Sequence, residues 1–173
     1  MCLLSRANAV GRAACPVILS TRASYSCFLL QTPKEIVTVI QTGMRMRHIY
    51  LNVPHSTNLK PSWYGESIGH YEGTTLVVDT IGLNDKTFVD NYRTPHTDKI
   101  HVVERYTLSA DSNTLEILAT VDDPGAFTTP WSALQRYKRV KRATLAEDIC
   151  AENNSNYLNE EIRPIPQADK ADF

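Results

Sequence analysis

Three side chains suited to acid–base chemistry lie where a long irregular segment leads into a strand-like segment, Ile100–Leu108. Alternation along that strand places Glu104 on its apolar side and His101 on the opposite side. Burial of a carboxylate in an apolar cavity favours its protonated form, so such a group can serve as a general acid or base near neutrality. We therefore expect Glu104 and His101 to be an acid and a base. Either a β-bulge lets both face inward, or His96 takes the partner role from the preceding loop.

Each of these assignments has a structural alternative. Glu104 could instead sit at a barrel rim and pair with an arginine from a neighbouring strand. Asp79 shares a side with Val77 and Ile81, so an inward orientation would make it a second acid in the same cavity. Otherwise Asp79 accepts hydrogen bonds from turn N–H groups or anchors Arg105. A strand histidine becomes a candidate catalyst only where it faces the cavity near one of the two acids.

Aromatic and imidazole rings offer large flat surfaces with polar tips, which suit a hydrophobic, natural-product-like ligand. Six residues are predicted to contact such a ligand: Trp63, Tyr64, His70, Tyr71, Tyr106 and Trp131. The same rings can plug a core, and Trp131 directly after Pro130 fits that second role best.

The chain contains no serine or cysteine nucleophile motif, no phosphate-binding loop and no ligand cluster with metal-site spacing, so we expect neither a metal nor a cofactor. Its four cysteines stand at positions 2, 15, 27 and 150 without paired spacing. A bridge between Cys15 and Cys150 would close a long loop in an oxidising compartment. In a reducing compartment these two would be inert thiols.

Short segments rich in β-branched residues recur between turn signals, with little helical periodicity. The predicted strands and hairpins cover Glu35–Ile40, Met44–Leu51, Pro61–Thr80, Ile100–Leu108, Leu115–Val121 and Trp131–Val140. Ala143–Cys150 could form another strand or a short helix. The pattern indicates an all-β fold, and we expect an antiparallel up-and-down barrel of the lipocalin/calycin type because closure removes exposed edges. A two-sheet β-sandwich is the alternative.

At 173 residues with 42% hydrophobic content, the chain is long enough for one domain with a genuine core. We expect a poorly ordered or atypical N-terminal segment over residues 1–30. A single β-barrel domain is then predicted over residues 31–152, and an extended or disordered tail over residues 153–173.

Charge and hydropathy narrow the range of partners. The formal net charge is -1, which gives no electrostatic footprint for a nucleic acid. No apolar stretch approaches the ~20 residues that a membrane-spanning helix needs. We therefore expect a soluble protein, either secreted or periplasmic, or cytoplasmic. The acid-free beginning of the chain resembles an organelle transit segment.

Several motifs of the sequence resemble those of a large, mostly bacterial and often exported group of uncharacterised proteins. The matching residues are Trp63, Gly65, Ser67–Gly69, Glu72–Gly73, Thr75–Thr80, Pro95–His96, Asp98, His101–Val102, Glu104–Arg105, Asp122–Pro124 and Thr129–Trp131. The resemblance covers about residues 30–153 and brings no activity with it. Members of the group have a longer N-terminal part with a further strand, which looks absent or replaced here. The flanks of Cys15 and Cys150 are also similar to those of the group.

These observations lead to one main functional hypothesis and two rivals. The main one is a cofactor-free enzyme, with acid and base groups in a barrel cavity, that isomerises, dehydrates or cyclises a hydrophobic biosynthetic substrate. It predicts that Glu104→Gln leaves folding and ligand binding intact and abolishes turnover. The first rival is a non-catalytic, lipocalin-like carrier. The second is an assembly module that completes its sheet with a partner subunit, for example as a homodimer.

Overall fold

The computed structural model describes residues 2–6, 26–40, 45–90 and 92–140, and every regular element in them is a β-strand. The strands are β1 (Cys2–Arg6), β2 (Ser26–Gln31), β3 (Glu35–Ile40), β4 (Arg45–Leu51), β5 (Glu66–Glu72), β6 (Thr75–Ile81), β7 (His101–Leu108), β8 (Thr114–Asp122) and β9 (Trp131–Arg139). Strands β3 to β9 lie within a residue or two of the predicted segments, because alternation and turn residues agree there.

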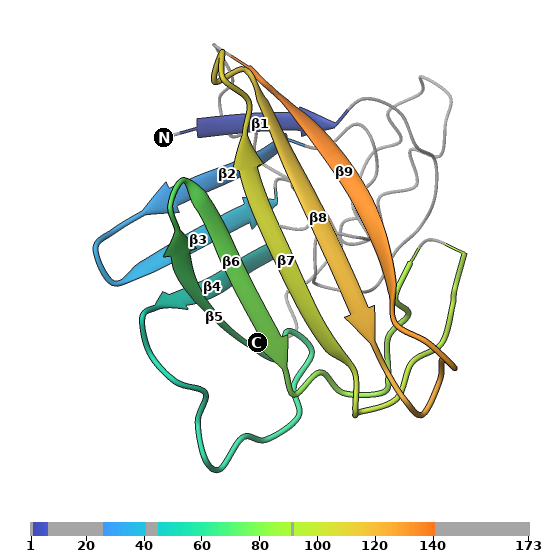
Figure 1. The fold of residues 1–173 in the computed structure, drawn as a ribbon. Coiled ribbons are helices and arrows are strands. Elements are labelled where there is room, and N and C mark those ends of the chain that lie inside the picture. The colour runs from blue at the N-terminus through green and yellow to red at the C-terminus, as the bar shows by residue number, and fades with distance from the viewer. Residues whose placement is uncertain (1, 7–25, 41–44, 91, 141–173) are drawn as a thin grey trace, which may run out of the picture.

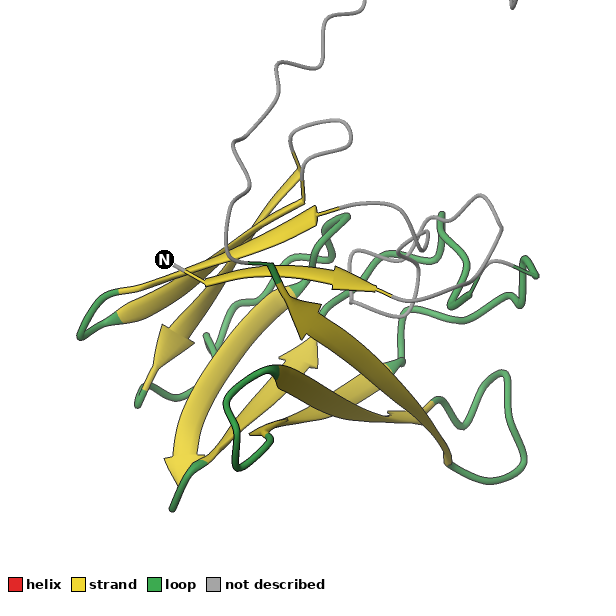
Figure 2. Ribbon diagram, turned by 90° about the horizontal axis from the view of Figure 1, so that it is seen from above, coloured by secondary structure: helices red, strands yellow, loops and turns green. Residues whose placement is uncertain are grey.

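The strands form one closed barrel in which each strand pairs with its neighbours in sequence and β1 pairs with both β2 and β9. In Figure 1, β6 to β9 run side by side in front of β1 to β4, and Figure 2 shows the sheet curling back on itself. The prediction of an all-β barrel is therefore confirmed. The predicted single domain over residues 31–152 has its described strands β3 to β9 in this one sheet.

Strand β1 closes the barrel by pairing with both β2 and β9. The hypothesis of an assembly module, which the resemblance suggested through a missing N-terminal strand, stays a prediction. Strands β1 and β2 were not predicted. The predicted Cys15–Cys150 bridge, the element over residues 143–150 and the tail over residues 153–173 lie outside the described residues.

One neighbouring pair departs from the up-and-down pattern. Strands β4 and β5 are parallel, and only three residue pairs join them, from Ile49–Ser67 to Leu51–Gly69. The connection over residues 52–65 returns the chain to the same end of the barrel, so β5 sets off in the direction of β4. Beyond this short pairing the two strands diverge, which leaves the rest of β4 without a strand partner on that side among the described residues.

Two apolar clusters fill the barrel and meet at the level of Glu104. Along β7, Val102 belongs to one cluster and Tyr106 to the other, and Glu104 lies between them with no exposed surface. The first cluster contains Ile36, Ile49, Leu51, Leu76, Val78, Tyr106, Leu115, Ile117 and Tyr137. The second contains Leu83, Val89, Ile100, Val102, Ala119 and Val121. The interior is thus apolar at both ends and polar in the middle.

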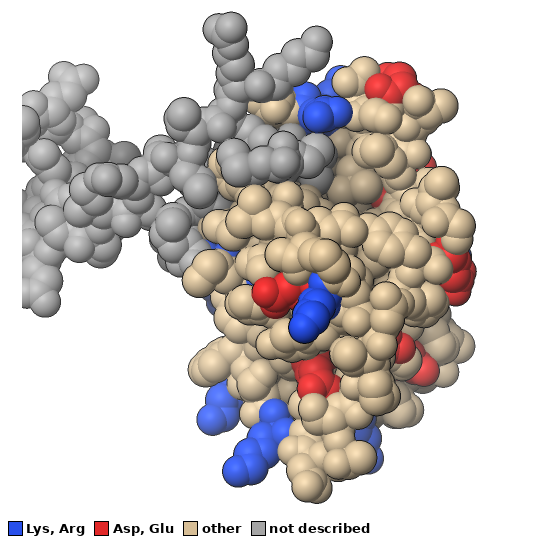
Figure 3. Space-filling view, turned by 90° about the vertical axis from the view of Figure 1, so that its left-hand side faces the viewer, with Lys and Arg blue, Asp and Glu red and all other residues tan. Residues whose placement is uncertain are grey.

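The surface shows charges of both signs. Figure 3 presents the side of the barrel that lies at the left in Figure 1, where blue and red side chains are scattered among uncharged residues and lie against one another near the middle of the view. In the part of the chain that the structure describes, no helix is long and apolar enough to cross a membrane.

Gly65 fixes the entry into β5 and provides a first test of the fold. Its φ is +61°, and a Cβ atom there would lie 2.4 Å from the carbonyl oxygen of Ile81. Gly73 has a similar φ of +59°, but a Cβ atom there would meet nothing within 4 Å. We expect Gly73→Ala to cost about 1 kcal/mol of unfolding free energy from backbone strain alone, and Gly65→Ala roughly 2 kcal/mol because a steric clash is added. Urea unfolding of both variants measures the difference, and equal losses would contradict the close approach of Gly65 to Ile81.

Candidate functional site

Glu104 lies in the interior and forms an ion pair with Arg47 of β4. Arg47 Nη2 and Glu104 Oε2 are 2.6 Å apart, and the side chains are 3% and 0% exposed. The inward orientation predicted for Glu104 is confirmed. Its partner is an arginine, as the structural alternative expected, but this arginine comes from β4 and not from a strand that neighbours β7. Its position differs from that alternative, because the pair lies between the two apolar clusters and not at a rim.

Two hydroxyl groups also contact Arg47. Its Nε donates a hydrogen bond to Ser67 Oγ at 3.0 Å, and its Nη2 donates one to Thr80 Oγ1 at 2.8 Å. The two hydroxyl oxygens are themselves 3.0 Å apart. The register of the sheet explains this meeting, because Ser67 pairs with Thr80 across β5 and β6 and both side chains point inward.

Tyr106 was predicted to contact a ligand, but it lies in the interior beside Glu104. Its Oη donates a 3.4 Å hydrogen bond to Glu104 Oε1, and the side chain is buried in the first apolar cluster. Burial, followed by the nearby negative charge of Glu104, raises the pKa of Tyr106 well above its ordinary value. Tyr106 is therefore a neutral hydrogen-bond donor to the carboxylate.

Asp79 lies on the outer face of the barrel, so it is not a second acid beside Glu104. In the sheet Asp79 pairs with Val103, and Glu104 pairs with Val78, which places the two acids on opposite faces. Asp79 does not anchor Arg105 either, because Arg105 Nη2 donates to Glu72 at 2.6 Å.

On this outer face Asp79 joins two imidazoles. Asp79 Oδ1 lies 2.9 Å from His55 Nε2 and 3.0 Å from His101 Nε2. His55 Nδ1 lies 2.9 Å from a carboxylate oxygen of Glu66. A hydrogen bond from Ser56 Oγ is the largest influence that lowers the pKa of Glu66, although slight burial acts to raise it. The predicted acid–base pair of Glu104 and His101 is thus divided by the barrel wall.

His96 is buried in the loop between β6 and β7, and both of its ring nitrogens are used there. Nδ1 donates to the carbonyl oxygen of Thr97 at 2.9 Å, and Nε2 lies 2.7 Å from Thr87 Oγ1. These contacts give His96 a structural role in the loop and not the partner role toward Glu104.

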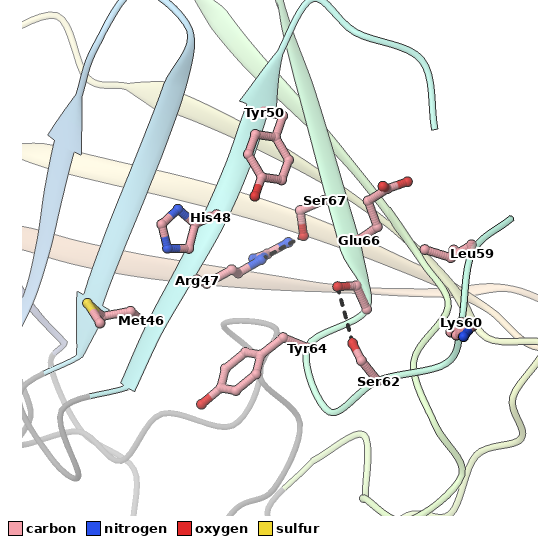
Figure 4. A pocket seen from close by; sticks show the side chains of 11 residues that line it. Met46, Arg47, His48, Tyr50, Leu59, Lys60, Ser62, Tyr64, Glu66 and Ser67 are labelled. Atoms are coloured by element: carbon pink, nitrogen blue, oxygen red, sulfur yellow. Dashed lines mark hydrogen bonds between the residues drawn. The ribbon is translucent and has the colours of Figure 1, made fainter. Parts of the chain in front are cut away.

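A cleft opens in the barrel wall where β4 and β5 diverge (Figure 4), and its volume is about 370 Å³. One wall consists of outward-facing residues of β4, and the other is the segment that leads into β5. The lining residues are Met46, Arg47, His48, Tyr50, Leu59, Lys60, Ser62, Tyr64, Gly65, Glu66 and Ser67. Arg47 and Ser67 point inward from their strands and are almost fully buried, so they form the floor. The cleft therefore reaches the polar layer of the interior from outside.

His48 is the imidazole that lines this cleft, and a carboxylate orients it. His48 Nδ1 lies 3.0 Å from Glu35 Oε2, and the ring stacks on Tyr50 with centroids 6.2 Å apart. A neutral imidazole that donates from Nδ1 to a carboxylate keeps a lone pair on Nε2. Nε2 has no partner among the described residues, so it remains for a molecule in the cleft.

Of the other predicted ligand contacts, only Tyr64 lines the cleft. Trp63 is 56% exposed beside it. Tyr71 Oη donates to Gln31 at 3.1 Å, and His70 lies 3.3 Å from Glu72 on the outer face. Trp131 packs edge-on against Phe127 at the second apolar cluster, which is the position expected of a core plug.

The described residues contain no group of three or more His, Cys, Asp or Glu side chains that could hold a metal ion. Cys27 is a free, buried thiol, and burial raises its pKa to about 12 although the nearby Arg47 acts to lower it. Such a thiol is a poor nucleophile at neutral pH.

Sequence reasoning did not select Arg47, His48, Glu66 or Ser67 of the cleft, or Glu35, which contacts His48. The signal for Arg47 was its alternation with Ile49 and Leu51, which places all three on one side of β4. The signal for Glu35 and His48 was hairpin register, because Glu35 pairs with Tyr50, two residues from His48 on the same face.

Comparisons with known proteins add nothing to this geometry, since no family model, no curated protein and no solved structure matches the chain. The motif resemblance therefore stays a prediction.

Proposed function

We propose that the protein binds a small organic molecule in the cleft between β4 and β5 and catalyses a proton transfer on it, with His48 as the general base. The observation that carries this proposal is that His48 lines the cleft while its Nδ1 lies 3.0 Å from the carboxylate of Glu35. A carboxylate in that position fixes the orientation and tautomer of an imidazole and stabilises the imidazolium that forms when Nε2 accepts a proton.

The cleft also has the dimensions and chemistry of a small-molecule site. Its volume of about 370 Å³ lies within the usual range of ligand pockets. Tyr50 and Tyr64 offer aromatic surface, while Met46 and Leu59 offer apolar surface. This combination favours the hydrophobic, partly aromatic substrate that the sequence indicated. Isomerisation and dehydration next to a carbonyl group can each begin with removal of a proton by a base.

The proposal is tested by a reaction that needs only a base. When a base removes the C3 proton of 5-nitrobenzisoxazole, the C–H electrons form the nitrile and the N–O bond breaks to release the coloured 2-cyano-4-nitrophenolate. We expect His48→Gln to lower the rate of this elimination by roughly tenfold or more, because Gln keeps the shape of a polar side chain but cannot take the proton. The release of phenolate is followed by absorbance.

His70→Gln is the matched control for this experiment. His70 is as exposed as His48 (52% against 48% of the side chain) and also contacts a carboxylate, but it does not line the cleft. A rate that falls equally in both variants, or in neither, would overturn the assignment of His48.

The second candidate function is a non-catalytic carrier of the lipocalin type, which the aromatic and apolar walls of the cleft favour. Fluorescence of the aromatic anion 8-anilinonaphthalene-1-sulfonate reports binding separately from chemistry. A carrier would bind this dye equally with and without His48 and would not accelerate the elimination at all. The enzyme hypothesis expects equal binding together with the loss of rate in His48→Gln.

A further inference from the structure

The floor of the cleft can present one hydroxyl hydrogen to a ligand. Whether this hydrogen belongs to Ser67 or to Thr80 follows from how deeply each hydroxyl group is buried. Ser67 Oγ and Thr80 Oγ1 share one hydrogen bond, and each oxygen also accepts one from Arg47. Each hydroxyl has a single hydrogen to donate. If Ser67 donated to Thr80, the hydrogen of Thr80 would be left in a fully buried position with no further acceptor among the described residues. A buried donor without an acceptor is costly.

In the opposite direction the buried hydroxyl hydrogen of Thr80 has an acceptor. Thr80 then donates to Ser67, and Ser67, which lines the cleft, keeps its hydrogen for a ligand or for solvent. Both hydroxyl oxygens accept a hydrogen bond from the Arg47 guanidinium, and its positive charge makes the hydrogen of each hydroxyl group a better donor. Hydrogen bonds in such chains strengthen one another. Ser67 is therefore a strengthened donor aimed at the cleft.

The charge balance of the floor indicates which acceptor fits. Arg47 is paired with Glu104 at 2.6 Å, so the floor offers a strong dipole and little net positive charge. A strongly hydrated anion such as a carboxylate would lose its hydration for little electrostatic gain, whereas a ligand that enters neutral, or an anion whose charge is spread over an aromatic ring, loses less. A carbonyl oxygen enters neutral and becomes negative only during reaction, and a preorganised donor acts on the charge as it develops.

We propose that Ser67 binds the oxygen of a carbonyl substrate and that the substrate class is a small enolisable ketone or enone. This inference rests on the function proposed above. His48 Nε2 takes a proton from the carbon next to the carbonyl group, and the electrons of that C–H bond form a C=C bond. The π electrons of the carbonyl group move to its oxygen, which accepts the hydrogen bond from Ser67. The imidazolium then gives the proton to a different carbon: in a β,γ-enone the Cβ=Cγ electrons form a new C–H bond at the γ-carbon, the enolate C=C electrons become the Cα=Cβ bond, and the electron pair on oxygen re-forms the C=O bond. This completes an isomerisation that consumes no other reactant. Figure 4 shows His48 and Ser67 lining the same cleft.

A phenol that can bind neutral or ionised tests the oxyanion site directly. We expect 4-nitrophenol bound to the wild-type protein to be more ionised than the free phenol at the same pH, with the phenolate favoured by roughly tenfold. Absorbance of the phenolate under saturating protein measures the ratio. Ser67→Ala should abolish the enrichment, because no other inward-facing hydroxyl lines the cleft among the described residues.

Two further variants keep the test decisive. Ser132→Ala removes a hydroxyl from a similar Ser–Thr pair, 2.9 Å from Thr120 Oγ1 on the outer face, and should leave the enrichment unchanged. Thr80→Ser retains the donor to Ser67 and should also retain the enrichment, whereas Thr80→Val should reduce it. Circular dichroism establishes that each variant is folded.

The outcomes separate this inference from the function on which it rests. Enrichment of phenolate that is lost in Ser67→Ala and kept in His48→Gln supports the oxyanion site, whatever happens to the elimination rate. Binding of the phenol without enrichment, an enrichment that survives Ser67→Ala, or no binding at all overturns it. Loss of the elimination rate in His48→Gln would still support the base in each of those cases.

Discussion

Glu104→Ala is expected to lower the free energy of unfolding by about 3–5 kcal/mol, the largest loss that we predict for this protein. The substitution leaves the Arg47 guanidinium charged and 3% exposed between two apolar clusters, and removal of one partner from a buried ion pair carries a cost of this size. Urea unfolding followed by circular dichroism measures the loss.

The matched control is Glu116→Ala. Glu116 Oε1 and Arg136 Nε are also 2.6 Å apart, but these side chains are 43% and 64% exposed. Water screens this surface pair, so its loss should cost about 0–1 kcal/mol. Similar losses in Glu104→Ala and Glu116→Ala would show that Glu104 does not stabilise a buried charge.

A double variant separates the effect of the two buried charges from the effect of the volume that the two side chains fill. In Arg47→Met with Glu104→Met, apolar side chains of similar length replace both charges, and no charge is left buried. We expect this protein to recover most of the stability lost in Glu104→Ala. It would lose the polarisation of Ser67, so its enrichment of bound 4-nitrophenolate should fall as in Ser67→Ala.

This expectation replaces the one drawn from the sequence for Glu104→Gln. An uncharged amide still leaves the charge of Arg47 buried without its counterion, so we now expect Glu104→Gln to destabilise the fold. Any loss of activity in that variant has to be separated from unfolding before a role in chemistry is assigned to Glu104.

The sequence predicted the orientation of Glu104 but not its partner, for a physical reason. Alternation is a local property of one strand, and Ile100–Leu108 carries it clearly. The contact with Arg47 joins positions 57 residues apart, and no periodicity within either strand encodes it. Only the order and register of the intervening strands bring the two side chains together.

Asp79 shows where alternation fails even within one strand. Val77 and Val78 are both apolar, and in the structure both are buried, at 6% and 0% exposure. With apolar residues on both faces, the sequence does not determine which face Asp79 shares. Its neighbours His55 and His101 come from a loop and another strand, so the sequence did not predict this cluster on the outer face either.

The cleft escaped prediction because it results from a missing contact. Hydrophobic pattern and turn residues predicted β4 and β5 well, but the parallel pairing of only three residues follows from the path of residues 52–65. A loop with few residues that favour one turn type can follow several paths, so its sequence does not determine where the next strand pairs. The segment Asp122–Gly125, in contrast, carries strong turn residues where β8 ends, and the contacts of Asp123 show how this turn is held.

Asp123→Ala is expected to lower the free energy of unfolding by about 3 kcal/mol at neutral pH. The buried Asp123 carboxylate accepts hydrogen bonds from the N–H and Oγ1 of Thr97, both at 2.6 Å, and from the N–H of Gly125 at 3.0 Å. It thereby joins the end of the loop before β7 to the turn between β8 and β9. Truncation removes three partly buried hydrogen bonds to a charged acceptor, each of which contributes about 1.5–3 kcal/mol before relaxation.

The same contacts make this contribution depend on pH. Burial acts to raise the pKa of Asp123, but the hydrogen bonds from Thr97 and Gly125, with the charge of His96, hold it below its usual value. A carboxyl group with a lowered pKa in the folded state stabilises the fold fully above its unfolded pKa of about 3.9 and loses that effect as pH falls through the folded value. The stability gap between the wild-type protein and Asp123→Asn should therefore be constant from neutral pH to about pH 5 and shrink below about pH 4.

Asp111→Asn provides the comparison, because Asp111 has a lowered pKa from hydrogen bonds with Ser109 and Asn113 but is exposed to solvent. A gap for Asp123→Asn no larger than that for Asp111→Asn, or one that widens in acid, would show that the buried carboxylate does not hold the two loops together.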